Sequence, residues 1–260
     1  MDKMLQDQYT RHPVELRRTH GFDIYLDPSD LGISPSIGVL GWYEMRTTEL
    51  FVKLVRPGST VIDVGANVGF FTLLAARLAG NDGRVVSFEP EPTSFSLLSK
   101  SIKRNRFANV QAFQQCVSNR DGLATLHLSP GHHKGLHSTM RDLGGGKIVV
   151  ESTKLDTVAS RIGLAHVDLL KIDAEGAEPQ VLEGAEELLT RSKVKTIIME
   201  WEHPEIWADH DPIVGMILSR FDAYRFARSM PFIPPKKLTT NSRSFFEGGL
   251  GTNLYLRQRS

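Results

Sequence analysis

The sequence predicts an α/β protein with a doubly wound, mostly parallel sheet, because apolar strand-like segments alternate with segments of helical apolar spacing. The stretch from Thr60 to Phe71, TVIDVGANVGFF, is typical of a buried strand, a glycine-bearing turn and the start of a helix. Residues 167–172, VDLLKI, form a continuous apolar run, as in strands that are covered on both faces. Two strand-like segments near the C-terminus predict a closing antiparallel pair.

The elements follow in chain order. Proline and glycine break residues 1–41 into short pieces, with one strand expected at 22–26. The Arg56–Gly58 segment, RPG, ends the first helix, whereas Pro179 stands in a first helical turn, where proline is tolerated. Helices are expected at 43–55, 70–79, 93–104, 155–162, 177–189 and 212–221. Strands or extended segments are expected at 61–64, 84–88, 109–116, 123–129, 147–153, 167–172, 195–199, 224–228 and 252–256.

Composition and charge are those of an ordinary globular chain, with 40% apolar and 23% charged residues. The net charge of +1 favours neither nucleic acid nor an anionic membrane as a partner. The single cysteine, Cys116, rules out an internal disulfide and fits a reducing compartment. The N-terminus is polar, and no apolar run approaches the ~20 residues of a membrane span. We therefore expect a cytoplasmic protein with one main domain.

The loop after the first central strand predicts a ligand. Gly65 and Gly69 tolerate positive φ and let the main chain approach a bound molecule. Asn67 stands where a dinucleotide-binding loop has its second glycine, the residue that admits a pyrophosphate. Glu89 ends the next strand, 26 positions after Asp63, close to the ~20 expected for an acid that accepts ribose hydroxyl protons. The pattern favours an adenosine ligand without a pyrophosphate.

Several of these segments resemble successive motifs of one family, the FkbM family of S-adenosylmethionine-dependent methyltransferases. The segments are Tyr43-Glu44, IDVGANVGFFT, VVSFEPEP, TKLDTV, LLKIDAEGAEPQVLEGA and IIMEWEHP, in the order of the family, and the resemblance runs from about Gly41 to the C-terminus. It implies a class I methyltransferase (Rossmann-like) fold, a seven-stranded sheet with an antiparallel terminal strand. We expect this domain at 42–260, with 1–41 as an extension that covers the cofactor cleft.

The resemblance also implies residue roles for S-adenosylmethionine. The methionine part and the sulfonium would be held by Asp63, Gly65, Ala66, Asn67, Gly69 and Phe70. Glu89 would bind the ribose, and Pro90, Val117 and Ser118 would flank the adenine. Glu44 would close the site from the N-terminal side, and acidic Asp63 and Asp173 suit a cationic donor.

Methyl transfer to oxygen needs a base that removes the hydroxyl proton. The candidates are His203, which has a suitable intrinsic pKa, Glu200, which can also bind the acceptor, and Asp173, which also fits a structural and cofactor role. Asp173, Glu200 and Glu202 would be the oxygen ligands if Mg²⁺ took part, but no metal site is predicted.

The expected acceptor is a hydroxyl of a sugar, a polyketide or a glycan-like small molecule. The glycine-rich loop at 129–146 is expected to form a lid over it, and its histidines match no tetrahedral zinc pattern. Three alternatives stay open. An NAD-dependent oxidoreductase is disfavoured by Asn67 and by the lack of a Tyr-x-x-x-Lys pair, and a nucleic-acid methyltransferase by the net charge. The third is a cofactor-binding protein without turnover.

Overall fold

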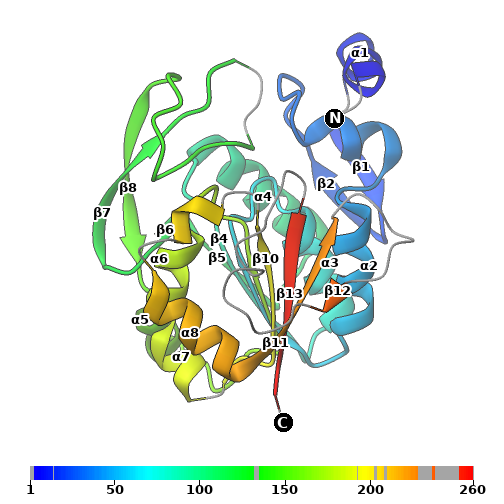
Figure 1. Ribbon diagram of the computed structural model, residues 1–260. Helices are drawn as coiled ribbons and strands as arrows, with labels where there is room; N and C mark the ends of the chain where they lie inside the picture. Colours follow the sequence, from blue (N-terminus) through cyan, green and yellow to red (C-terminus); the bar gives the residue numbers. More distant parts are fainter. Residues whose placement is uncertain are drawn as a thin grey trace.

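The centre of the protein, seen in a computed structural model, is a twisted eight-stranded sheet (Figure 1). The structure describes residues 3–13, 15–131, 135–191, 193–201, 204–207, 210–227, 236–237 and 252–259. The strands of the sheet are β3 (Thr60–Val64), β4 (Arg84–Phe88), β5 (Val110–Phe113), β9 (Leu169–Ile172), β10 (Thr196–Glu200), β11 (Phe221–Ala227), β12 (Lys236–Lys237) and β13 (Thr252–Gln258).

The strand order is β12-β11-β13-β10-β9-β3-β4-β5. The five strands from β10 to β5 are parallel, and β13 pairs antiparallel with both β10 and β11. Seven of these strands make the predicted sheet with its closing antiparallel pair, and two-residue β12 adds an edge. The predicted fold class is therefore confirmed.

Helices cover both faces of this sheet because side chains along each strand point alternately to either side. Val61 packs into the apolar cluster on one face and Ile62 into the cluster on the other. The first face carries α2 (Met45–Leu54), α3 (Phe70–Ala79) and α4 (Pro92–Asn105). The second face carries α5 (Leu155–Arg161), α6 (Glu178–Glu183), α7 (Glu186–Thr190) and α8 (Asp211–Arg220), which are gathered on one side in Figure 1. Among the described helices, none is long and apolar enough to cross a membrane.

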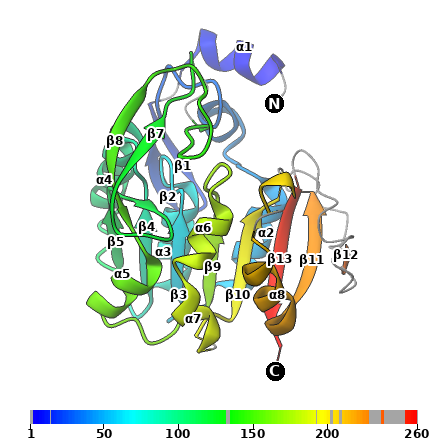
Figure 2. The same cartoon turned by 60° about the vertical axis from the view of Figure 1, so that its left-hand side comes forward.

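Two smaller units stand above one end of the central sheet (Figure 2). The N-terminal unit consists of α1 (Lys3–Arg11), β1 (Leu16–Thr19), β2 (Phe22–Tyr25) and the π-helix η1 (Ser36–Leu40). The other is a three-stranded sheet of β6 (Cys116–Val117), β8 (Lys147–Thr153) and β7 (Gly122–His127), in that order. A short 3-10 helix, η2 (Pro204–Trp207), precedes α8.

Two predicted elements differ from the structure, and one helix of the structure was not predicted. The strand expected at 109–116 ends at Phe113, because Cys116 pairs with Ser152 of the smaller sheet. The helix expected at 177–189 is divided at Gly184, where a Cβ would lie 2.1 Å from the Ser118 carbonyl oxygen. The helix α1 was not predicted, because only its Tyr9 is buried, against η1.

Candidate functional site

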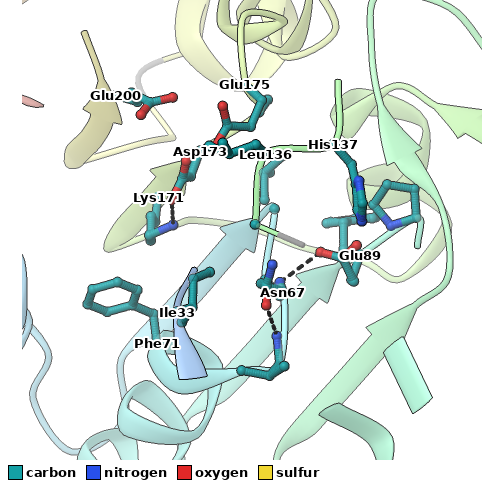
Figure 3. Close-up of a pocket in the computed structure, with 18 of the residues that line it drawn as sticks. Ile33, Asn67, Phe71, Glu89, Leu136, His137, Lys171, Asp173, Glu175 and Glu200 are labelled. Atoms are coloured by element: carbon teal, nitrogen blue, oxygen red, sulfur yellow. Dashed lines mark hydrogen bonds and ion pairs between the residues drawn. The ribbon is translucent and has the colours of Figure 1, made fainter. Parts of the chain in front are cut away.

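A cavity of about 540 Å³ lies at the carboxyl ends of the central strands (Figure 3). The loops that follow β3, β4 and β9 form its floor. The N-terminal unit lines it with Gln6, Gly32, Ile33 and Ser36. The loop between β7 and β8 lines it with Gly135, Leu136, His137 and Thr139. Residues of the predicted extension and of the predicted lid thus both line the cavity, whereas the domain boundary at 42 stays a prediction.

The loop after β3 is held by main-chain contacts with its neighbours. The amides of Gly65 and Ala66 both donate to the Phe88 carbonyl oxygen, at 3.0 and 2.9 Å. A Cβ at Gly65, whose φ is 74°, would lie 1.8 Å from the carbonyl oxygen of Asp173. Only glycine therefore allows the loop after β3 to touch the loop after β9.

Glu89 presents a carboxylate that the main chain holds from both sides. Its Oε2 accepts from the Asn67 amide at 2.7 Å, and its Oε1 accepts from the Glu91 amide at 2.9 Å. Asn67 adopts positive φ, 49°, and its side chain accepts from the Val68 amide at 2.7 Å. Burial raises the pKa of Glu89 to about 7, although the two amides oppose this shift. The carboxylate is therefore fixed in place and titrates near neutral pH.

The other end of the cavity is acidic. One carboxylate oxygen each of Asp173, Glu175 and Glu200 lies within 4.8 Å of the others. In Figure 3 these three side chains lie together, away from Glu89. Glu200 ends β10 and is 7% exposed.

Lys171 is a buried cation at this acidic end. Its Nζ lies 3.0 Å from Asp173 Oδ2 and 3.8 Å from Asp63 Oδ1. Burial alone would lower the pKa of Lys171, but the charges of Asp173, Asp63 and Glu44 outweigh it and raise the pKa. Lys171 therefore stays charged, and it neutralises much of the charge of Asp173.

Glu175 connects the acidic end to the loop above it. Its φ of 51° is unusual for a residue with a side chain. The buried Ser138 hydroxyl donates to the Glu175 carbonyl oxygen at 2.7 Å, and Arg141 Nη2 lies 3.6 Å from its carboxylate. Arg141 of the lid loop thus pairs with Glu175. Contacts with the lid loop therefore hold Glu175.

The structure brings most of the predicted site residues together. Those that line the cavity are Glu44, Gly65, Ala66, Asn67, Phe70, Glu89, Pro90, Val117, Asp173 and Glu200. Their contacts with a ligand stay predictions. His203 and Glu202 lie outside the described residues.

Three predicted cofactor residues are not among the lining residues. Asp63 is fully buried beneath the loop and accepts from the Thr72 hydroxyl at 2.6 Å. Gly69 packs against Leu98, whose Cδ1 would lie 2.4 Å from a Cβ at that position. The Ser118 amide donates to the Thr153 carbonyl oxygen at 2.9 Å, within the smaller sheet. Each of these residues supports the wall of the cavity from behind.

Other residues that line the cavity were not predicted from the sequence to be part of the site. Phe71 lies under Lys171, whose Nζ is 5.0 Å from the ring centroid. The periodicity of α3 marked Phe71 as an apolar position but gave no sign that it lines a cavity. Ile33 and Leu136, in the two covering units, follow no pattern that could have indicated a site.

Asp173, Glu175 and Glu200 offer the oxygen ligands that Mg²⁺ prefers. Lys171 already sits 3.0 Å from Asp173 and supplies a positive charge there. Carboxylates in this arrangement also fit the binding of hydroxyl groups, which donate to them.

Comparisons with known proteins show the family to which the chain belongs. The family model described as Methyltransferase FkbM domain matches residues 63–226. The 31-O-demethyl-FK506 methyltransferase FkbM of Streptomyces tacrolimicus is 32% identical over 162 residues, 51% of this chain and 62% of that protein. Methyltransferase sdnD of Sordaria araneosa is 27% identical over 172 residues, 55% of this chain and 66% of that protein. The chain thus spans slightly less than two thirds of these two relatives.

Two further proteins match this chain over a larger share of its length. The 2-O-methyltransferase NoeI of Sinorhizobium fredii is 25% identical over 181 residues, 63% of this chain and 72% of that protein. The solved structure of a methyltransferase FkbM from Methylobacillus flagellatus has a TM-score of 0.50 at 13% identity, covering 97% of this chain and 58% of that one, which shows the shared fold. Because the family model covers more than half of the sequence, the chain belongs to the FkbM family of methyltransferases.

Proposed function

We propose that the protein is an S-adenosylmethionine-dependent O-methyltransferase that acts on a hydroxyl of a sugar, a polyketide or a glycan-like small molecule. The observation that carries this proposal is one cavity with a fixed carboxylate, Glu89, at one end and an acidic group at the other. The names of two relatives, 31-O-demethyl-FK506 methyltransferase and 2-O-methyltransferase, support methyl transfer to oxygen.

The Glu89 end suits the nucleoside. Glu89 already accepts two amide hydrogen bonds, and its carboxylate has further lone pairs for the ribose hydroxyls. Gly65 and Ala66 carry no bulky side chain, so a ligand can approach the main chain closely. Pro90 and Val117 supply the apolar surface on which an adenine would lie. When bound, S-adenosylmethionine supplies an activated methyl group on a cationic sulfur.

The acidic end suits the acceptor hydroxyl. In the in-line displacement, the bond from the acceptor oxygen to the methyl carbon would form as the bond from that carbon to sulfur breaks. S-adenosylhomocysteine would be the leaving group, and the acceptor oxygen would lose its proton to a base. We assign Glu200 as that base, because it is buried in the cavity wall, whereas the Asp173 carboxylate is already engaged in an ion pair with Lys171. His203 remains the predicted alternative. Holding acceptor and donor in line can contribute ~7 to 11 kcal/mol to the rate enhancement.

Calorimetry with S-adenosylhomocysteine and with NAD tests the cofactor assignment. We expect S-adenosylhomocysteine to bind and NAD not to bind, since Asn67 replaces the glycine that admits a pyrophosphate. Binding of NAD in place of S-adenosylhomocysteine would overturn the proposal in favour of an oxidoreductase.

Mass spectrometry of methyl transfer to a panel of methyl glycosides and macrolide polyols tests the reaction. For an accepted panel member, Glu200→Gln should lower kcat by about 10²–10⁴-fold and leave the affinity for S-adenosylhomocysteine unchanged. Glu15→Gln, at an exposed acid that is not among the residues lining the cavity, is the matched control. Cofactor binding without transfer to any panel member would favour a binding protein without turnover.

A further inference from the structure

Asn253 lies in β13, and the neighbouring strands β10 and β11 fix its position on both sides. It pairs with Glu200 of β10 and with Phe226 of β11 across antiparallel ladders. Directly opposite residues of such a ladder place their side chains on the same face of the sheet. The Asn253 side chain therefore shares a face with Glu200, and Asn253 is only 4% exposed.

The Asn253 amide group reaches the start of α2. Its Nδ2 lies 3.4 Å from Glu44 Oε2 and 3.3 Å from the hydroxyl oxygen of buried Thr47. Glu44 lines the cavity, and Asn253 is not among the lining residues. These contacts join positions 209 and 206 residues apart, and both Glu44 and Asn253 lie outside the 63–226 segment that matches the family model.

The backbone of Glu44 is held in an unusual conformation. Its φ of 41° and ψ of 69° place it in the left-handed region, which residues with a Cβ rarely adopt. Its carbonyl oxygen accepts from the Thr48 amide at 2.9 Å, and the Thr48 hydroxyl donates to the Tyr43 carbonyl oxygen at 2.5 Å. Such outliers persist where the surroundings fix them and are common at ligand-binding sites. The backbone and the carboxylate of Glu44 are thus both constrained.

The negative charge of Glu44 helps to raise the pKa of Lys171, so Glu44 lies at the acidic end of the cavity. The carboxylates that line this end, those of Glu44, Asp173, Glu175 and Glu200, outnumber the charge of Lys171 and together suit a cationic ligand group. The amide of Asn253 donates a hydrogen bond but carries no charge. It can therefore orient the Glu44 carboxylate without adding a positive charge beside it.

We propose that Asn253 is a positioning residue, which holds the Glu44 carboxylate in the cavity wall so that Glu44 binds the ammonium group of the cofactor's methionine end. This inference rests on the proposed cofactor. It extends the cofactor site to a strand at the far end of the chain.

The test is calorimetry with two ligands that differ in the amino-acid end. S-adenosylhomocysteine carries the ammonium and carboxylate groups of this end, and 5′-methylthioadenosine keeps the adenine, ribose and thioether but lacks both groups. We expect Asn253→Ala and Glu44→Gln each to weaken S-adenosylhomocysteine binding about tenfold and to leave 5′-methylthioadenosine binding unchanged. The double variant should bind S-adenosylhomocysteine as Glu44→Gln does, because the two residues act through one carboxylate.

Asn253→Asp is a second variant of the same shape, in which a negative charge meets Glu44. It should weaken S-adenosylhomocysteine binding at least as much as Asn253→Ala, so it decides the question if Asn253→Ala does not fold. Asn105→Ala, at an asparagine whose side chain contacts Asp23 and Ser101 instead, is the control.

The outcomes separate this inference from the proposed function. A wild-type protein that binds neither ligand would contradict the cofactor assignment itself. Wild-type binding with unchanged affinity in Asn253→Ala, or additive losses in the double variant, would overturn the role of Asn253 alone. Equal losses for both ligands would mean that Asn253 acts on the fold and not through Glu44.

Discussion

The two ends of the cavity hold their carboxylates in different ways. At one end, both oxygens of Glu89 accept from main-chain amides, those of Asn67 and Glu91, which lie in the loops directly after β3 and β4. At the other end, side chains do this work: Lys171, two residues before Asp173, pairs with its carboxylate, and Arg141 of the lid loop pairs with the carboxylate of Glu175, whose carbonyl oxygen accepts from the Ser138 hydroxyl.

Because of this difference, the two ends depend to a different degree on the identity of the neighbouring side chains. A carboxylate gripped by main-chain amides keeps its place whatever the neighbouring side chains are, provided that the loops keep their shape. The Glu175 carboxylate, which pairs with Arg141 and whose main chain is held by Ser138, depends on the lid loop, which lies between β7 and β8. We infer that the first end serves the nucleoside of the cofactor, which is constant, and that the second end, which Glu44 also lines, receives the methionine end of the cofactor and the acceptor. The four predictions below test this contrast, from the largest expected effect to the smallest.

Gly65→Ala should disrupt the close contact between the loop after β3 and the loop after β9, which connects the two ends of the cavity. The added Cβ would lie 1.8 Å from the Asp173 carbonyl oxygen, so one of the two loops must move. We expect a loss of at least ~3 kcal/mol in the free energy of unfolding, measured by denaturant titration. Gly58→Ala is matched, because Gly58 has a φ of 83° and nothing within 4 Å of its added Cβ; it should cost about 1–2 kcal/mol. Equal losses in the two variants would contradict the close approach.

Glu89→Gln should weaken the cofactor end specifically. The loss of a charged hydrogen-bonding partner should cost about 1.5–3 kcal/mol of S-adenosylhomocysteine binding free energy, measured by calorimetry. Glu91→Gln is the control, because the Glu91 side chain accepts from the Thr93 and Ser94 amides at the start of α4. That variant should lower stability and leave the affinity unchanged. Unchanged affinity in Glu89→Gln would refute the ribose assignment.

Ser138→Ala should loosen the acidic end only. Removing this hydroxyl takes a donor from the Glu175 carbonyl and an acceptor from the Met140 and Arg141 amides, which should cost about 1–3 kcal/mol of stability. Hydrogen exchange should become faster at Met140 and Arg141 and stay unchanged at Asn67. Ser160→Ala, at an exposed serine, should change neither. Faster exchange at Asn67 as well would show that the two ends are not independent.

The affinity for 5′-methylthioadenosine should rise about tenfold between pH 6 and pH 8. The pKa of Glu89 is raised to about 7, so in the free protein the group is mostly protonated at pH 6 and mostly ionised at pH 8. Only the ionised form accepts hydrogen bonds from both ribose hydroxyls. Calorimetry at the two pH values measures the rise, and Glu89→Gln should show none. An affinity that falls with pH would contradict the raised pKa.

The sequence predicted the fold because its signals are local and repeated. The alternation of apolar strands and amphipathic helices predicted the parallel sheet and its closing antiparallel pair, which the structure has. It did not predict that the strand at 109–116 would end at Phe113, because the pairing of Cys116 with Ser152 is a contact between distant segments. The interruption of the helix at Gly184 depends in the same way on a neighbour, the Ser118 carbonyl.

The sequence by itself determined the Glu89 end of the site. Gly65, Asn67 and Glu89 fall at strand ends that adjacent parallel strands bring together, so their positions follow from the fold class. Only the tertiary structure decided the contacts of Glu175 with Ser138 and of Glu44 with Asn253, which join residues 37 and 209 positions apart. Side-chain contacts of this kind leave no periodic pattern in the sequence, because they depend on how separate elements pack and not on the residues beside them.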